Sequence, residues 1–165
     1  MKAYMTNGTY PFLEKLKEKQ HTSPFLLLHN GVKTVAYYED TKPTIFESSR
    51  DYHVLEKVGT LTETGFCSMS HLPVTEEGKP IFEMDFKQKV KEITLVDGVI
   101  ASRILQPERG HSYILLVEWQ EQKYFQKWKS TEPLPTKKKD SYISGEVYTE
   151  TFDVGEEEEF GEEEE

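Results

Sequence analysis

The sequence predicts an α+β protein of the ferredoxin-like α/β sandwich class, with two related halves packed as a pseudo-dimer with antiparallel sheets. The main observation is the order of hydrophobic patterns along the chain. Residues 65–152 read as strand, helix, strand, strand, helix, strand, which is the order of the split β-α-β-β-α-β unit. Residues 1–60 carry a looser version, β-α-β-β-β-α. A length of 165 residues suits one compact domain or two small halves that share a core.

The first half is expected to contain short strands and two helices. Strands are predicted at 2–7, 25–30, 34–39 and 44–47, and a helix is predicted after Pro11. Asn30-Gly31 lies between two of the hydrophobic runs and is a strong hairpin signal. Ser48 and Asp51 have the spacing of a capping box, so residues 52–58 are predicted to form a helix that ends at Gly59.

The second half carries the clearest patterns. One apolar face at helical spacing predicts a helix over 80–93, formed by Phe82, Phe86, Val90 and Ile93. Strands are predicted at 65–75, 99–105, 112–119 and 142–152, of which 112–119 has the strongest strand character. Tyr124, Phe125 and Trp128 predict a second, shorter amphipathic helix. These elements complete the β-α-β-β-α-β order.

The charge of the chain is concentrated at its C-terminus. The formal net charge is −10, and Asp153 with the glutamates of 156–159 and 162–165 supplies nine of the negative charges, so residues 1–152 carry about −1. Residues 153–165 are therefore expected to be a solvated, disordered acidic tail. Cys67 is the single cysteine, which excludes an intramolecular disulfide framework. With neither a signal peptide nor an apolar run long enough to span a bilayer, the sequence favours a cytoplasmic protein.

Several functional classes leave no pattern in this sequence. It has no nucleophile-elbow, Walker or dinucleotide-binding glycine motif. The five histidines lack the spacing of a metal site, so no metal ligands are predicted. The basic cluster around Trp128 and Lys137–Lys139 is short and the body is nearly neutral, which argues against nucleic-acid binding.

Three stretches of the second half resemble the antibiotic-biosynthesis-monooxygenase (ABM) domain: FEMDFKQK (82–89), VDGVIASRILQP (96–107) and VEWQEQKYFQKW (117–128). More narrowly, they look like the two-domain haem-degrading monooxygenases of Gram-positive bacteria. The start of the chain, MKAYMTNGTYPFL, also looks like the start of those proteins. The related "target of RNAIII-activating protein" (TRAP) group has the same long architecture and a proposed signalling role. The resemblance covers about residues 1–132.

The resemblance implies a haem site formed by an asparagine, a tryptophan and an iron-ligating histidine, and only one of these matches here. The tryptophan corresponds to Trp119. The asparagine position holds Ser70, which is followed by His71. The histidine position falls at about Lys138, in STEPLPTKKK. Lysine is charged at neutral pH and a poor iron ligand, and the prolines of that stretch should end the helix that would carry it.

Two functions remain open. In the first, the protein is a haem-degrading monooxygenase that opens haem with O₂ and an electron donor. Trp119 and Ser70 are then the candidate catalytic residues, and Lys138 and His71 the candidate cofactor-binding residues. In the second, it is a non-catalytic, TRAP-like regulatory or interaction protein that has lost haem chemistry. The expected oligomeric state is a monomer with pseudo-dimeric halves, or a homodimer.

Overall fold

The computed structural model describes residues 1–20 and 24–155, in which eight strands and three helices are present. The strands are β1 (Lys2–Asn7), β2 (Phe25–His29), β3 (Thr34–Asp40), β4 (Arg50–Val58), β5 (Gly65–Pro73), β6 (Val99–Pro107), β7 (Ser112–Trp119) and β8 (Tyr148–Val154). The helices are α1 (Tyr10–Lys19), α2 (Lys79–Ile93) and α3 (Gln122–Lys129). Within the described residues, no helix combines the length and the apolar character needed to cross a membrane.

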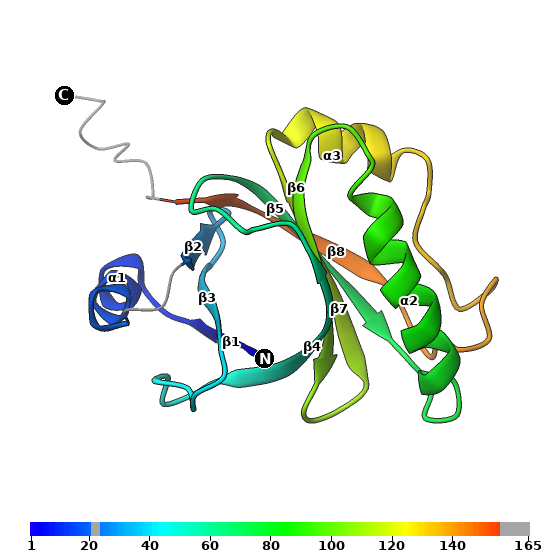
Figure 1. The fold of residues 1–165 in the computed structure, drawn as a ribbon, viewed down its shortest axis with the longest axis horizontal. Coiled ribbons are helices and arrows are strands. Elements are labelled where there is room, and N and C mark those ends of the chain that lie inside the picture. Colours follow the sequence, from blue (N-terminus) through cyan, green and yellow to red (C-terminus); the bar gives the residue numbers. More distant parts are fainter. Residues whose placement is uncertain (21–23, 156–165) are drawn as a thin grey trace.

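The strands form one closed antiparallel barrel in the order β1-β3-β2-β8-β5-β7-β6-β4 (Figure 1). The second half contributes β8-β5-β7-β6, which is the ferredoxin-like order, so the α+β ferredoxin-like class is confirmed. The first half contributes β4-β1-β3-β2, which is the same order within its own sequence. Pairing of β2 with β8 and of β4 with β6 joins the two halves edge to edge. The result is a barrel, in which neither half keeps a free sheet edge.

Two predicted elements of the first half are wrong. Residues 52–58 belong to strand β4 and not to a helix. A register shift between Val54 and Glu56 breaks the alternation, so that Tyr52 and Val54 pack in the barrel whereas Leu55 and Val58 pack on the helix side. This bulge gives the apolar residues a spacing that resembles a helix.

The predicted strand at 44–47 is an irregular loop. Its backbone N–H groups are bonded to side chains: Ile45 N donates to Tyr38 Oη (3.0 Å) and Phe46 N to Thr44 Oγ1 (3.0 Å). Phe46 itself is buried against α1 and its neighbouring strands. The last strand is also shorter than predicted, because β8 begins only at Tyr148. It runs to Val154 and so includes the first two residues of the predicted tail; residues 156–165 lie outside the described residues.

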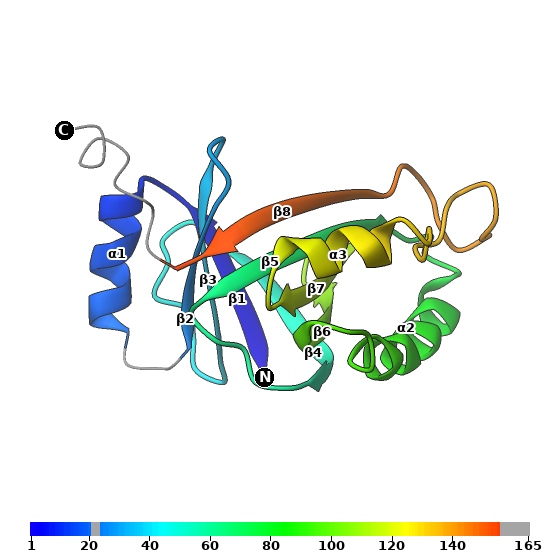
Figure 2. The ribbon, with the colours of Figure 1, turned by 90° about the horizontal axis from the view of Figure 1, so that it is seen from above.

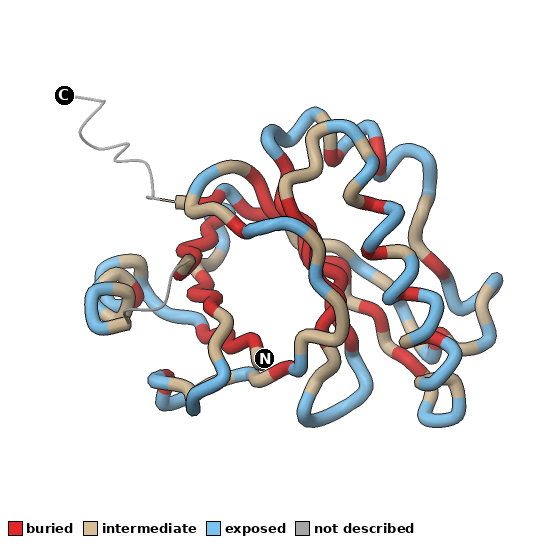
Figure 3. Tube along the Cα trace, viewed as in Figure 1, coloured by how far each residue is buried: buried red, intermediate tan, exposed pale blue. Residues whose placement is uncertain are grey.

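Three hydrophobic clusters hold the structure. The first fills the barrel and includes Met5, Met69 and Leu116. The second lies between the sheet of the second half and helices α2 and α3, which cover its outer face (Figure 2). The third is smaller and packs α1 onto β1, β2 and β3. Buried residues accordingly follow the strands and the inner faces of the helices (Figure 3).

Candidate functional site

Trp119 ends β7 and lies in the cluster between sheet and helices. Its side chain is 0% exposed, and its indole Nε1 donates a hydrogen bond to Ser68 Oγ at 3.0 Å. Phe125 and Trp128 of α3 pack against it, with ring centroids 5.9 and 5.5 Å away. The indole therefore has its polar and apolar contacts satisfied within the chain.

Ser70 lies on the same face of β5 as Ser68. Its Oγ is 2.9 Å from Thr149 Oγ1 of β8, and both serines are 1% exposed. Ser70 is the serine of this face that is predicted from the sequence, and Ser68 is not. The alternation Phe66, Ser68, Ser70 along one strand face could have indicated that both serines share the side of the sheet on which Trp119 lies.

His71 points to the opposite face of β5, as strand alternation predicts. Its Nε2 lies 2.9 Å from Glu150 Oε1, and its ring stacks on Tyr148 at a centroid distance of 4.4 Å. Lys33 Nζ, from the β2–β3 hairpin, is 2.5 Å from the other Glu150 oxygen. Burial lowers the pKa of His71, although the neighbouring carboxylate opposes this shift. His71 thus belongs to a polar cluster on the far side of the sheet from Trp119.

Lys138 is exposed in a turn of the segment that connects α3 to β8. Helix α3 ends at Lys129, before Pro133 and Pro135, as the two prolines predict. The fold therefore brings Trp119 and Ser70 to one face of the sheet, places His71 behind it, and leaves Lys138 at the surface.

An open groove lies beside this cluster, and we call it the α3 groove. It has a volume of about 470 Å³ and is lined by Val96, Asp97, Lys123, Tyr124, Lys127, Trp128 and Thr131. Its aromatic lining residues are Tyr124 and Trp128, which we call its floor, and we call the two exposed lysines one helical turn apart, Lys123 and Lys127, its rim. Gly98 has a φ of +84° and allows close approach here, because a Cβ at this position would lie 2.1 Å from the Tyr124 ring.

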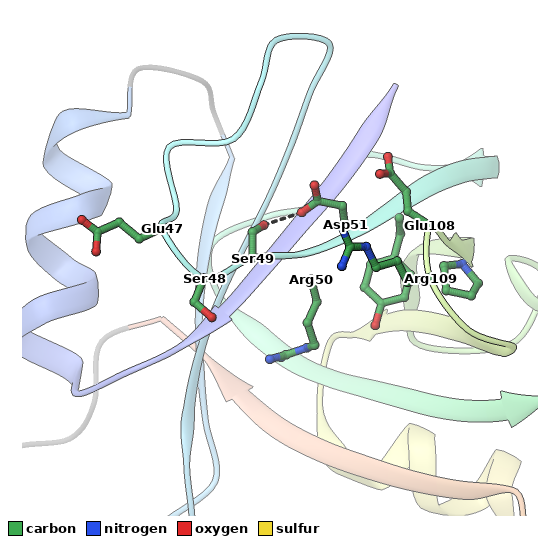
Figure 4. Close-up of a pocket in the computed structure, with 9 residues that line it drawn as sticks. Glu47, Ser48, Ser49, Arg50, Asp51, Glu108 and Arg109 are labelled. Carbon is green, nitrogen blue, oxygen red and sulfur yellow. Dashed lines mark hydrogen bonds between the residues drawn. The ribbon is translucent and has the colours of Figure 1, made fainter.

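A second pocket of about 500 Å³ lies where β4 begins, next to the β6–β7 hairpin (Figure 4). It is lined by Glu47, Ser48, Ser49, Arg50, Asp51, Tyr52, Pro107, Glu108 and Arg109. Arg50 Nη2 donates to Asn7 Oδ1 at 2.8 Å, and Glu108 pairs with Lys2 at 2.6 Å. Three acidic and two basic side chains line this pocket, so it has no strong preference for either sign of charge.

Charged groups also lie inside the barrel. Arg103 Nε of β6 donates to Glu39 Oε2 of β3 at 2.8 Å. Glu118 is 0% exposed and accepts hydrogen bonds from the backbone and hydroxyl of Thr62. Burial raises the pKa of Glu118, although the bonds from Thr62 oppose this shift. Arg103 and Glu39 pair with each other and Glu118 is bonded to Thr62, all in the packed interior, which is typical of structural polar networks.

The residues present do not fit a haem ligated between sheet and helices. Among residues 1–20 and 24–155, no group of three His, Cys, Asp or Glu side chains could hold a metal ion. A haem iron needs only an axial protein ligand, so the position of each single histidine is what matters for haem. The histidines there lie elsewhere: His29 on β2, His53 beside Glu108, His71 beside Glu150, and His111 beside Glu76. The space over Trp119 is filled by aromatic side chains of α3. Among the described residues, Phe125 and Trp128 are the rings that pack on the Trp119 indole, which is 0% exposed, and no histidine ring packs on it.

Known proteins provide the remaining comparison. No family model matches the chain. It is 21% identical over 130 residues to a haem-degrading monooxygenase of Listeria monocytogenes, and the aligned region covers 79% of this chain and 78% of that protein. It is 22% identical over 138 residues to the signal transduction protein TRAP of Staphylococcus aureus, strain MRSA252, with the same two coverages.

Solved structures share the fold. A ferredoxin-fold protein of Listeria monocytogenes related to antibiotic biosynthesis monooxygenases has a TM-score of 0.80 at 22% identity and covers 94% of this chain and 95% of that one. A major regulator of staphylococcal pathogenesis has a TM-score of 0.82 at 20% identity, covering 92% and 98%. A haem-degrading enzyme of Listeria monocytogenes has a TM-score of 0.74 at 17% identity, covering 93% and 99%. At these identities the structural likeness establishes the fold alone.

Proposed function

We propose that the chain is a non-catalytic regulatory or interaction protein within the ABM-domain group that contains haem-degrading monooxygenases and TRAP proteins, to which its relatives and structural neighbours belong. The observation that carries this proposal is the state of Trp119. The indole is fully buried, donates its N–H to Ser68 and is covered by Trp128. A residue that is meant to contact a bound porphyrin would need an accessible ring face.

Among the residues that the structure describes, no suitable iron ligand contacts Trp119, and this supports the same proposal. Haem oxygen chemistry requires an axial donor, commonly a neutral imidazole. His71 is on the other face of β5 and is bonded to Glu150, and Lys138 is solvent-exposed and cationic at neutral pH. Sites are grafted onto folds, so a retained scaffold can outlast the chemistry it once supported.

Haem oxidation with O₂ and an electron donor is the second candidate function. Two observations favour it: the relationship to the Listeria enzyme and the α3 groove. The groove is of ligand size and aromatic, and Lys123 and Lys127 on its rim could meet the two carboxylates of a porphyrin. In this candidate, Trp119 and Ser70 are the catalytic residues, and His71 or Lys138 is the cofactor-binding residue.

A haemin titration followed by visible spectroscopy separates the two functions. For a non-catalytic protein, we expect no shift of the Soret band to that of a protein-ligated haem, and no loss of haem absorbance after ascorbate is added in air. A shift that saturates at low micromolar haemin, followed by bleaching, would overturn the proposal.

A variant pair tests whether the cleft itself is closed. Pro133→Ala/Pro135→Ala restores helix-compatible residues after α3, and the same background with Lys138→His adds the imidazole that the family resemblance implies. We expect neither protein to ligate haem, because aromatic side chains fill the space over Trp119. A five-coordinate haem spectrum in the Lys138→His protein, but not in its double-proline control, would indicate an open cleft that lacks only its ligand.

The two halves of the barrel also support a proposal about the oligomeric state of the protein. Because they share one strand order, we propose that the single chain stands in for two subunits of a one-unit ABM dimer. We therefore expect a monomer in light scattering coupled to size exclusion, at a mass near 19.2 kDa. A dimer mass would show that the barrel does not replace the intersubunit pairing.

A further inference from the structure

The α3 groove has a chemical character that the proposed function does not use. Its lining combines the floor residues Tyr124 and Trp128 with the apolar Val96, and the rim lysines Lys123 and Lys127 are exposed. Asp97 is the one acidic side chain in its lining. An occupant that suits this surface would combine an aromatic or apolar group with negative charge beside it.

The last ten residues of the chain have this composition. They read EEEEFGEEEE, in which Phe160 is preceded by four glutamates and followed, after Gly161, by four more. The aromatic floor of the groove can pack against the single phenylalanine ring, and the positively charged lysine rim can pair with the flanking carboxylates. None of the ten residues carries a positive charge that would oppose this pairing.

The distance from the end of β8 to the groove is compatible with the length of this segment. Val154 pairs with Gly65 at the start of β5, and the next β5 residue, Phe66, pairs with Trp119 at the end of β7. Helix α3 starts three residues later, so the end of β8 lies about two strand spacings, or about 10 Å, from the connection that leads into the groove. Figures 1 and 2 both place the end of β8 and the start of α3 at the same end of the sheet.

Phe160 is six residues beyond Val154, and an extended chain of six residues spans about 20 Å. Lys123 and Tyr124 are in the first turn of α3, within that reach. The tether also raises the local concentration of the segment to the order of millimolar, so a weak intrinsic interaction suffices for substantial occupancy.

We propose that residues 156–165 dock intramolecularly in the α3 groove, with Phe160 on the aromatic floor and glutamates facing Lys123 and Lys127. The segment then acts as a built-in competitor that occludes the groove against other anionic, aromatic ligands. High salt releases it, because the lysine–glutamate pairs lie at the surface and are screened. The proposal concerns the groove alone, so it holds whether or not the protein has haem chemistry.

Carbodiimide coupling of the full-length chain tests the docking directly, since this zero-length reaction joins a carboxylate to an amine in contact with it. Peptide mass spectrometry then identifies the joined residues. We expect the glutamates of 156–165 to be coupled mainly to Lys123 and Lys127, with a yield that falls about fivefold or more in 1 M NaCl. A mixture of ¹⁴N- and ¹⁵N-labelled chains identifies coupling within one molecule, because docking in cis gives no mixed-isotope products.

Two variants sharpen the result. Phe160→Ser keeps every tail charge and removes the ring, and we expect the coupling yield to drop several-fold. Lys87 and Lys91 are exposed on α2 with the same i, i+4 spacing as the groove lysines. Lys87→Glu/Lys91→Glu is therefore the charge-matched control for Lys123→Glu/Lys127→Glu. A docked segment should shield Trp128 from the quencher acrylamide, so quenching of tryptophan fluorescence is measured in both variants, together with coupling of the tail to the remaining lysines. We expect the shielding to be lost in the groove variant Lys123→Glu/Lys127→Glu and kept in the control.

Three outcomes would overturn the inference. Tail coupling spread over exposed lysines in proportion to their exposure would show an unbound segment. Mixed-isotope products would place the segment on a second copy of the chain. Unchanged coupling in Phe160→Ser would show that the aromatic floor takes no part. Each of these results is independent of the haemin titration.

Discussion

The variant Arg103→Met removes a buried guanidinium that connects the two halves of the barrel. Arg103 lies on β6 and is 3% exposed. Its Nε donates to Glu39 on β3 at 2.8 Å, and its Nη1 donates to the carbonyls of Val58 (3.2 Å) and Ser102 (2.9 Å). Methionine keeps much of the side-chain length and removes every one of these donors.

The loss of stability in Arg103→Met arises from the Glu39 carboxylate, which stays in place without its cationic partner. The Glu39 carboxylate is 11% exposed and keeps one short hydrogen bond, from the Tyr37 hydroxyl at 2.6 Å. Removing one partner of a buried ion pair costs about 3–5 kcal/mol, and the remaining tyrosine bond and partial exposure favour the lower end. We expect Arg103→Met to lower the free energy of unfolding by about 3 kcal/mol. Replacing both charges, as Glu39→Gln/Arg103→Met, should cost about 1–2 kcal/mol less than the sum of the single variants.

Urea unfolding measures these changes, with the midpoint converted to free energy at constant slope. Lys57→Met is the matched control, because Lys57 pairs with Arg103 in register on β4 and is exposed. It should change stability by no more than about 0.5 kcal/mol. If Arg103→Met costs less than about 1 kcal/mol, or if the double variant shows the sum of the single effects, the ion pair does not hold the halves together.

Three further variants probe the site and its surroundings. Ser68→Ala leaves a buried indole N–H without its acceptor and should cost about 1–3 kcal/mol in urea unfolding, with a changed near-ultraviolet dichroism of tryptophan. Gly98→Ala should destabilise by at least about 2 kcal/mol because its Cβ would meet the Tyr124 ring, whereas Gly110→Ala, which has a similar φ and open space, should cost only about 1 kcal/mol. Because burial lowers the pKa of His71 in the folded protein, protonation is easier in the unfolded chain, and stability is lost as the pH falls below about 6.5. His71→Gln should flatten the stability profile between pH 7 and 5, and an unchanged slope would show that another group is responsible.

The second half illustrates how much local pattern can predict. The apolar face of α2 and the strand character of β7 are repeated over many residues, so their hydrophobic period identified both elements nearly to their ends. The opposite orientations of Ser70 and His71 also followed from strand alternation alone. These features depend on residues that are close together in the sequence, so a local sequence pattern is enough to predict them.

The first half illustrates the limit. The residues of β4 were predicted to be helical, since a bulge at Val54–Glu56 places apolar side chains on both faces at helix-like spacing. The strand forms because β4 pairs with β1 on one side and β6 on the other, and each of these strands lies about 50 residues away in the sequence. A local pattern cannot contain that information.

Some features of the candidate site also follow from the sequence, whereas others depend on the tertiary structure. The sequence by itself determined the ABM resemblance, the position of Trp119 at a strand end and the break of the helix before Pro133. Only the tertiary structure decided that Ser68 satisfies the indole, that Trp128 covers it, and that Lys123 and Lys127 border an open groove. The physical reason is that burial, hydrogen-bond satisfaction and accessible space depend on contacts between β5, β7 and α3, which no single segment specifies.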